Sequence, residues 1–288
     1  MTQEGKLTRF WRKPRPDKVR AIHANFRVGM RLLGIAPRPK VTGIDFEDAA
    51  RAFMVKSEVQ QIDGVICSNE IDGRAVRFFV SNRFDLIQQH HLKGEFYEQK
   101  ELMLITQHFE QGGVFADIGA NVGNHSLYVG LFLAPSAIIP FEPNPAVQPT
   151  LKINLLLNRL SHIVEDTHID VGLSDTNGHA EIIIPDTRNL GGAKLQSADG
   201  PGSIQLMQGD LALGDREVDF IKIDVEGMEM RVLAGLEMTI KRRRPKIFIE
   251  VDNSNAAVFT QWVANNEYRV VERFRRYQEN ENYLVIPQ

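Results

Sequence analysis

The stretch from Val114 to Ser126, VFADIGANVGNHS, constrains the fold of this chain more than any other. Its first five residues are mostly apolar and predict a short buried strand, and the apolar run Leu127–Leu133 predicts the helix that follows. Between them, Gly119 and Gly123 allow a turn with positive φ or a close approach to a ligand. A strand, a glycine loop and a helix N-terminus in this order are typical of α/β folds that bind nucleotides. An ordinary strand-to-helix turn in an unrelated α/β protein remains an alternative.

The polar residues of this loop indicate which nucleotide it binds. A dinucleotide fingerprint requires G-x-G-x-x-G, but Asn121 and Asn124 stand where its second and third glycines belong. Asp117, at the end of the strand, would repel a pyrophosphate and would attract a cationic ligand, by about 4 kcal/mol at 4 Å and an effective dielectric constant of 20. S-adenosylmethionine carries a sulfonium and an ammonium group. We therefore expect it as the cofactor, bound by Asp117, Gly119, Asn121 and Gly123.

A second apolar strand, Ala137–Phe141, ends in Glu142, 25 residues after Asp117. Doubly wound nucleotide folds hold a ribose diol at this place, because a carboxylate can accept hydrogen bonds from both hydroxyls. Pro143 and Pro145 end the strand and favour a helix start soon after it. Glu142 is therefore a candidate ribose ligand, and a solvated loop carboxylate is the alternative.

A third strand candidate, Phe220–Ile223, precedes Asp224 and Glu226. The carboxyl ends of strands in open parallel sheets are where ligands bind, so these two acids are candidates for a base, a metal pair or a cap on the helix predicted over Met228–Leu236. Lys222 lies inside this strand and needs a partner in a buried sheet, for which the sequence offers Asp219 or Asp224.

The order of these motifs resembles the FkbM family of methyltransferases. The resemblance covers roughly residues 86–255. It rests on YEQKEL (Tyr97–Leu102), DIGANVGNHSL (Asp117–Leu127), FEPNP (Phe141–Pro145), VGLSD (Val171–Asp175), IKIDVEGMEMRVLAG (Ile221–Gly235) and PKIFIE (Pro245–Glu250). It implies a Rossmann-like class I methyltransferase fold, a mostly parallel seven-stranded sheet with helices on both faces. It also implies S-adenosylmethionine as methyl donor and O-methylation of a hydroxyl on a sugar, polyketide or related metabolite.

The resemblance also implies roles for single residues. Asp117, Gly119 and Asn121 match the family's donor loop, and Glu142 matches its ribose acid. Asp175, after the third strand in family order, matches the place where such folds contact adenine. The segment around Asp210 departs from the family's usual pattern, and this departure falls on the acceptor side.

Length and composition predict one main domain with extensions. A chain of 288 residues can form a single large core, and 43% apolar with 25% charged residues is ordinary for a globular protein. We expect a basic arm and amphipathic helix over residues 1–40, a small β-containing extension over 41–100, and the methyltransferase domain over 101–288. In the extension, Asp72-Gly73 predicts a hairpin between strands at Val65–Cys67 and Ala75–Val80. The C-terminal segments Tyr268–Glu272 and Asn282–Ile286 predict a last pair of strands, one of them antiparallel.

Charge and cysteine content bear on partners and compartment. Residues 1–40 contain eleven Lys or Arg and two acidic residues, so they carry about +9 and the remainder about −12. The arm therefore suits an acidic partner, an anionic membrane surface or a second subunit, and packing on its own acidic domain is the alternative. One cysteine, no long apolar run and no signal-type N-terminus predict a cytoplasmic protein without a transmembrane segment.

The sequence predicts an insertion on the ligand side of the sheet. A hairpin is expected to begin at His179–Ile184, and Asn189–Gly202 reads as a glycine-rich loop. Loops of this length are usually functional or mobile, so it is a candidate for binding the acceptor.

Methyl transfer to a hydroxyl needs a positioned acceptor and benefits from a general base. Asp224 and Glu226 are the leading catalytic candidates, and Glu250, expected to close the next strand, is the third. His125 could also be a base, although a histidine in a first helical turn is more often solvated or capping. A metal site is a further alternative, with Asp224, Asp252 and Asn253 as oxygen ligands suited to Mg²⁺; no metal is part of the favoured interpretation.

Other functions fit the sequence less well. A nucleic-acid adenine methyltransferase needs an Asn/Asp-Pro-Pro-aromatic motif where Asp224-Val225-Glu226-Gly227 stands, and a cytosine C5 enzyme needs a Pro-Cys pair, whereas Cys67 follows Ile66. The acidic core also argues against binding nucleic acid. A donor-binding interaction module without catalysis and a nicotinamide-dependent oxidoreductase remain as alternatives.

Overall fold

The computed structural model describes residues 63–183, 194–197 and 204–288. The chain divides into two compact units, Met1–Ile66 and Cys67–Gln288. The second contains the sheets and helices described below, except for the first two residues of the first strand, Val65 and Ile66. The arm and helix expected over residues 1–40 lie outside the described residues. No helix in the described part of the chain is long and apolar enough to cross a membrane.

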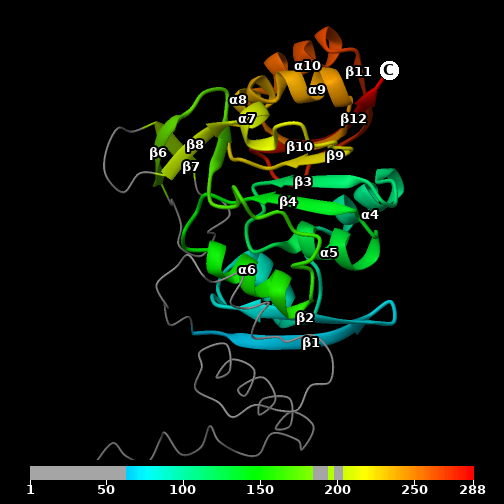
Figure 1. Ribbon diagram of the computed structural model, residues 1–288, viewed down its shortest axis with the longest axis vertical. Coiled ribbons are helices and arrows are strands. Elements are labelled where there is room, and N and C mark those ends of the chain that lie inside the picture. Colours follow the sequence, from blue (N-terminus) through cyan, green and yellow to red (C-terminus); the bar gives the residue numbers. More distant parts are fainter. Residues whose placement is uncertain (1–62, 184–193, 198–203) are drawn as a thin grey trace, which may run out of the picture. The chain divides into compact units, whose positions relative to one another are not determined.

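The main sheet has six strands in the order β11-β12-β10-β9-β3-β4 (Figure 1). Their bounds are β3 Val114–Ile118, β4 Ala137–Phe141, β9 Phe220–Ile223, β10 Lys246–Asp252, β11 Tyr268–Phe274 and β12 Asn280–Pro287. The pairs β3–β4, β3–β9 and β9–β10 are parallel, and β12 runs antiparallel to both β10 and β11. This is the Rossmann-like arrangement that the sequence predicts, with the expected antiparallel strand near its C-terminus.

Among the described residues the main sheet has six strands, whereas the family resemblance implies seven. Beyond β4, the next segment makes one isolated parallel bridge, from Ile138 to Val164. The Ile138 N–H donates to the Ile163 carbonyl and the Glu165 N–H to the Ile138 carbonyl, but the next donor that β4 would need is Pro140, which has no N–H, so the ladder does not extend. The strand that follows, β5 (Gly172–Ser174), instead begins a second sheet of order β5-β8-β6-β7, with β6 at Gly178–Ile183, β7 at Lys194–Ser197 and β8 at Ile204–Gln208. Strand β7 interrupts the loop expected over residues 189–202, and the rest of that loop lies largely outside the described residues.

Helices cover both faces of the main sheet because successive residues of each strand point to opposite sides. Ala116 and Ile118 belong to a core cluster that includes buried residues of α8 (Glu229–Gly235), α9 (Glu237–Arg243) and α10 (Ala256–Asn265). Phe115, between them in sequence, packs with α4 (Gln99–His108) and α5 (Asn124–Phe132) on the other face (Figure 1). The short α7 spans Gly209–Leu213.

The predicted hairpin forms from β1 (Val65–Ile71) and β2 (Arg74–Val80), and Asp72 and Gly73 have the positive φ values that its turn requires. Strand β2 is followed by α3 (Leu86–Leu92) and is held by α6 (Gln148–Leu157). Asn154 Oδ1 accepts a hydrogen bond from the Phe79 N–H at 2.6 Å, and Asn154 Nδ2 donates to the Val122 carbonyl at 2.8 Å. One α6 side chain thereby ties β2 to the loop after β3.

Candidate active site

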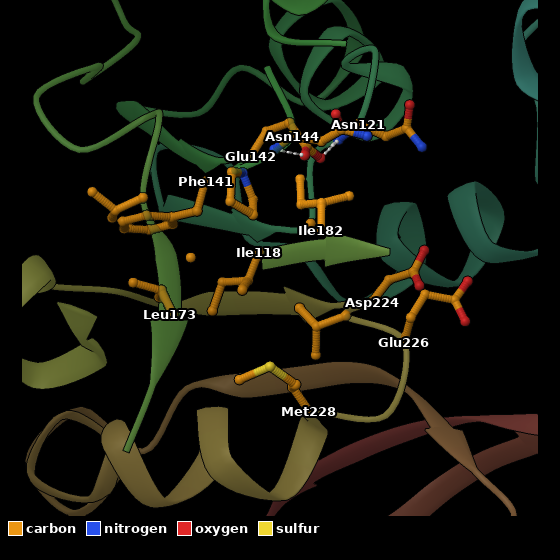
Figure 2. A pocket seen from close by; sticks show the side chains of 15 residues that line it. Ile118, Asn121, Phe141, Glu142, Asn144, Leu173, Ile182, Asp224, Glu226 and Met228 are labelled. Carbon is orange, nitrogen blue, oxygen red and sulfur yellow. Dashed lines mark hydrogen bonds between the residues drawn. The ribbon is translucent and has the colours of Figure 1, made fainter. Parts of the chain in front are cut away.

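A pocket with about 630 Å³ of empty space opens at the carboxyl ends of β3, β4 and β9. We call it the first pocket. Its lining combines apolar side chains with polar groups from the three loops that follow these strands: Ile118, Gly119, Asn121, Phe141, Glu142, Pro143, Asn144, Val171, Gly172, Leu173, Ile182, Asp224, Val225, Glu226 and Met228. Figure 2 shows the Glu142 carboxyl beside Asn121 and Asn144, with Ile118, Leu173 and Met228 giving the pocket an apolar side. The pocket therefore lies where open parallel sheets bind ligands.

The loop after β3, residues 119–123, has the backbone that its glycines predict. Gly119 and Gly123 have φ values of +78° and +89°, and Asn121 is left-handed at +51°. A Cβ added to Gly119 would lie 1.8 Å from the Asp224 carbonyl oxygen. This glycine therefore lets the β3 and β9 loops touch, which closes one end of the first pocket.

Asp117 lies beneath this loop, fully buried, and does not line the first pocket. Its Oδ2 accepts hydrogen bonds from the Ser126 N–H at 3.0 Å and the Ser126 hydroxyl at 2.6 Å, in the first turn of α5. Its Oδ1 is 3.4 Å from Lys222 Nζ. The structure thus places Asp117 as a buried charge partner and helix-capping group.

Lys222 finds two carboxylates and a carbonyl inside the sheet. Its Nζ lies 3.7 Å from Asp224 Oδ2 and donates to the Gly119 carbonyl at 2.6 Å. Burial disfavours the charge of Lys222, but Asp117, Asp224 and Glu98 outweigh it and raise the pKa of the ammonium group. The expected partner Asp224 is confirmed. Asp219 is not a partner, since it accepts the Val114 N–H at 2.7 Å.

Glu142 is buried in the wall of the first pocket, so the reading of it as a solvated loop carboxylate is wrong. Each of its oxygens accepts one backbone N–H, from Asn121 and from Asn144, both at 2.7 Å. Burial raises the pKa of Glu142 to about 7, and these two hydrogen bonds oppose the rise. Because an ionised carboxylate has about four lone-pair positions, both oxygens can still accept a hydroxyl.

Asp175 does not line the first pocket. Its Oδ1 lies 2.8 Å from both Arg231 Nε and Nη2, and it accepts the Ser174 hydroxyl at 2.9 Å. The residues that reach the pocket from this segment are Val171, Gly172 and Leu173, just before Asp175 in the VGLSD motif. The motif marked the right segment, but sequence alone did not indicate which of its side chains faces inward.

A second pocket adjoins the first and shares Asn121, Asp224 and Glu226 with it. Its described lining is strongly acidic and contains no lysine or arginine: Leu86, Ile87, Tyr97, Glu98, Asn121, Asp224, Glu226, Gly227, Glu229, Glu250, Asp252, Tyr277, Glu279 and Asn280. Strand β9 ends at Ile223, and both Asp224 and Glu226 line the two pockets, so the expectation that only one of them faces the site is wrong. The N–H of Gly227, before α8, is bound by Glu229 rather than by either of them.

Glu250 lies inside β10, which continues to Asp252, so the expectation that Glu250 closes the strand is wrong. It accepts hydrogen bonds from the amides of Asn280 and Asn282 on β12. Burial, followed by the charges of Asp224, Glu98 and Glu226, raises the pKa of Glu250 to about 9. Side-chain oxygens of Asp224, Glu226 and Glu250 come within 4.8 Å of one another, so the structure brings together the three catalytic candidates.

These three carboxylates also form the acidic group that could hold a cation, in place of the expected set of Asp224, Asp252 and Asn253. Asp252 Oδ1 accepts hydrogen bonds from the N–H and hydroxyl of Ser254, at 2.8 and 2.7 Å. Asn253 Nδ2 donates to the Gln278 carbonyl. Carboxylate oxygens are the ligands that Mg²⁺ prefers, but exposed acidic groups often exist without a metal.

Two further residues of the site were not identified correctly from the sequence. His125 is 4% exposed, so the expectation that it is solvated is wrong. Burial lowers its pKa to about 3, with Lys222 adding to the effect, so it is neutral at physiological pH. Its Nε2 lies 3.5 Å from Glu98 Oε2. Glu98 belongs to the YEQKEL motif, which carried the resemblance but gave no indication of a role.

A Rossmann-like sheet with two joined pockets at its strand ends is the architecture of an α/β enzyme that uses a nucleotide. The family model described as the methyltransferase FkbM domain matches residues 117–283 of the sequence, which is more than half of the chain. The chain therefore belongs to the FkbM methyltransferase family, as its motifs indicate.

Individual relatives are more distant. The chain is 29% identical over 172 residues to the hexuronic acid methyltransferase AglP of Haloferax volcanii, covering 58% of this chain and 66% of that protein. It is 27% identical over 151 residues to Methyltransferase 1 of Beauveria bassiana, covering 45% and 60%. The chain thus spans less than two thirds of the length of either relative. The crystal structure of methyltransferase FkbM from Methylobacillus flagellatus has a TM-score of 0.48 and 17% identity, over 69% of this chain and 52% of that one.

Proposed function

We propose that the protein is an S-adenosylmethionine-dependent O-methyltransferase whose acceptor is a hydroxyl of a sugar or related metabolite. The observation that carries the proposal is that the first and second pockets meet at Asn121, Asp224 and Glu226. A donor in one pocket and an acceptor in the other would have their reacting groups at this junction. Holding two reactants in line is a large part of catalysis in a displacement reaction.

The residues of the first pocket fit the donor. Glu142 offers acceptor positions for a ribose diol, and Phe141 and Leu173 offer apolar surface for a base. Asn121 Oδ1 is buried without a hydrogen-bond partner among the described residues, so it is available to a ligand's donor group. Gly119 also lines this pocket and, having no Cβ, leaves room beside it for the Asp224 carbonyl. When bound, S-adenosylmethionine supplies an electrophilic methyl group on a sulfonium.

The second pocket, to which we assign the acceptor, suits a hydroxyl better than a carboxylate. Glu98, Asp224 and Glu250 face it, and its described lining carries no basic side chain to receive an anion. We propose that Asp224 orients or deprotonates the acceptor hydroxyl, with Glu226 in support and Glu250 as the next candidate. The name of the Haloferax relative points to a sugar acceptor, and the donor-rich hydroxyls of sugars match a pocket of carboxylate acceptors.

The proposal is tested by mass spectrometry of a panel of glycosides and polyketide alcohols incubated with the protein and isotopically labelled S-adenosylmethionine. A gain of one labelled methyl group supports it and identifies the acceptor class. Calorimetric binding of S-adenosylmethionine without transfer to any acceptor would favour the interaction module. Binding of a nicotinamide cofactor in its place would favour an oxidoreductase.

A further inference from the structure

Glu98 has a backbone conformation that its position in the helix does not explain. It is the N-cap of α4, with φ 58° and ψ 50°, which is left-handed and unfavourable for a glutamate. Its carbonyl accepts the Leu102 N–H at 3.0 Å, but its side chain makes no capping hydrogen bond. Strained backbone of this kind persists when surrounding contacts impose it, and it is concentrated at functional sites.

The contacts that impose it come from the helix after the glycine loop. Asn124, the first residue of α5, accepts the Tyr97 N–H at 2.9 Å and donates to the Tyr97 carbonyl at 3.0 Å. On the other side of Glu98, Glu101 is buried in a two-point ion pair with Arg276. The chain is therefore fixed just before and just after Glu98, and the Glu98 carboxyl is held in the lining of the second pocket.

Within this pocket, Glu98 and Asp224 have opposite environments. Asp224 has a side chain that is 33% exposed, and its Oδ2 lies 3.7 Å from the Lys222 ammonium. The Glu98 side chain is 14% exposed, and among the described residues the one basic side chain within 4 Å of its carboxylate is the neutral His125. Burial, then the charges of Asp224 and Glu101, raise the pKa of Glu98 to about 8. Two carboxyl groups that differ in this way in burial and in partners are suited to different roles in acid–base catalysis.

We propose that Glu98 is the residue that takes the proton from the acceptor hydroxyl, while Asp224 orients that hydroxyl. His125, which does not line the second pocket, positions the Glu98 carboxyl. The inference rests on the proposed O-methyltransferase function. In the methyl-transfer step, the acceptor O–H bond breaks and its proton passes to the Glu98 carboxylate. The oxygen lone pair forms the new bond to the methyl carbon as the carbon–sulfur bond breaks, and that bond's electron pair stays on sulfur.

The charged and titratable groups around Glu98 come from every element packed against it, so its ionisation depends on all of them. They are Tyr97, Glu101, His125, Lys222, Asp224, Glu250, Arg276 and Tyr277. Because burial, and after it the charges of Asp224 and Glu101, disfavour its charged form, the Glu98 carboxylate is a stronger base than an ordinary glutamate, and its pKa of about 8 lies close to neutral pH.

The test compares Glu98→Gln with Glu95→Gln, a substitution at an exposed residue of the same segment that lines neither pocket. Methyl glucoside and methyl glucuronide serve as acceptor probes, and S-adenosylhomocysteine reports donor-site binding. We expect Glu98→Gln to lower kcat by roughly 10²–10⁴-fold with donor-site affinity within about twofold of the parent. The parent kcat/KM should rise with pH to a plateau above about 8, and the variant should lose this rise. Glu98→Asp, which keeps a carboxylate, should recover part of kcat.

A second measurement does not depend on turnover. In protein with ¹³C-labelled glutamate carboxyls, the signal absent from Glu98→Gln should titrate near pH 8 and should shift when a probe is added. If neither probe is methylated while this signal behaves as expected, the proposed function fails and the assignment of Glu98 to the acceptor pocket holds. A Glu98 signal that titrates near pH 4.5 or ignores both probes, or a variant with parental kcat and pH profile, overturns the inference.

Discussion

Asp117 and Lys222 are direct neighbours across the parallel strands β3 and β9, and the Lys222 ammonium lies 3.4 Å from the Asp117 carboxylate with both side chains buried. The same ammonium reaches Asp224 and the Gly119 carbonyl. One buried cation therefore joins the glycine loop to the acid at the junction of the two pockets. The Asp117–Lys222 pair therefore holds the Gly119 loop and Asp224 in position relative to each other.

We expect Asp117→Ala to reduce the free energy of unfolding by about 3–5 kcal/mol, because removing one partner leaves a buried charge poorly compensated. Donor binding should weaken as well, through the loop, by about 1–3 kcal/mol. Urea denaturation and calorimetry with S-adenosylhomocysteine measure the two effects. Asp215→Ala, at a fully exposed carboxylate that pairs with Arg242, is the control and should leave the stability close to that of the parent. Parental stability in Asp117→Ala would contradict the structural role.

Gly119→Ala should impair donor binding by more than about tenfold, since its Cβ would overlap the Asp224 carbonyl oxygen and the residue has a positive φ. Gly178→Ala is the matched control, because Gly178 has open space around it and no positive φ. Calorimetry with S-adenosylhomocysteine compares them. Equal affinity in the two variants would show that contact between the β3 and β9 loops does not shape the donor pocket.

The stability of the protein should fall as pH rises from about 6.5 to 9. The pKa values of Glu142, Glu98 and Glu250 are raised to about 7, 8 and 9, with burial as the largest cause, whereas their ordinary value is 4.5. The folded state therefore binds more protons than the unfolded state in this window, so each carboxyl loses its stabilising contribution as pH passes its folded pKa. Urea denaturation between pH 6.5 and 9 measures the slope, and Glu250→Gln should flatten its upper part. Stability that rises with pH would exclude these shifts.

For two buried histidines the dependence of stability on pH has the opposite sign. Burial lowers the pKa of His91 to about 4 and that of His125 to about 3, from an ordinary value of 6.5. Below pH 6.5 the unfolded state gains protons that the folded state does not, so this contribution to stability is lost as pH falls. His125→Gln should therefore weaken the loss of stability on acidification, whereas the exposed His162→Gln should not.

Asp224→Asn should lower turnover by roughly 10²-fold or more while changing donor affinity much less, because it keeps the shape of the side chain and removes the charge that orients the acceptor hydroxyl. Asp170→Asn, at an exposed position outside both pockets, is the control. Near-parental turnover in Asp224→Asn would show that Asp224 does not orient the acceptor hydroxyl, and Glu250 would become the next candidate for that role. Loss of activity on addition of a chelator, with recovery in Mg²⁺, would instead assign Asp224, Glu226 and Glu250 to a metal.

The parts of the fold that local pattern determines were predictable. Strands β3, β4 and β9 have the bounds that their apolar runs indicate, and the Asp72-Gly73 turn forms as expected, because these features depend on residues adjacent in sequence. The missing seventh strand was not predictable. It depends on whether the segment around Val164 pairs beyond a single bridge, which the tertiary arrangement decides.

The site shows the same division. Glu142, Asp224 and Glu226 follow buried strands and reach the first pocket, as their positions indicate. Asp117 and Asp175 occupy equally suggestive positions but bind Lys222 and Arg231, because partners distant in sequence decide where a carboxylate points. The role of Glu98 was not predictable for the same reason. The Asn124 side chain, distant in sequence, binds the backbone of Tyr97 and so holds the neighbouring Glu98 at the site.

Transfer of a deuterated methyl group from S-adenosylmethionine to a glycoside is the measurement that tests the proposed function most directly. We expect a product that gains one labelled methyl group and keeps it after mild alkaline treatment, as an ether formed at a hydroxyl would. A label that alkali removes would place the methyl group on a carboxylate, as an ester. That result, or tight donor binding with no transfer to any acceptor, would contradict hydroxyl O-methylation at the junction of the two pockets.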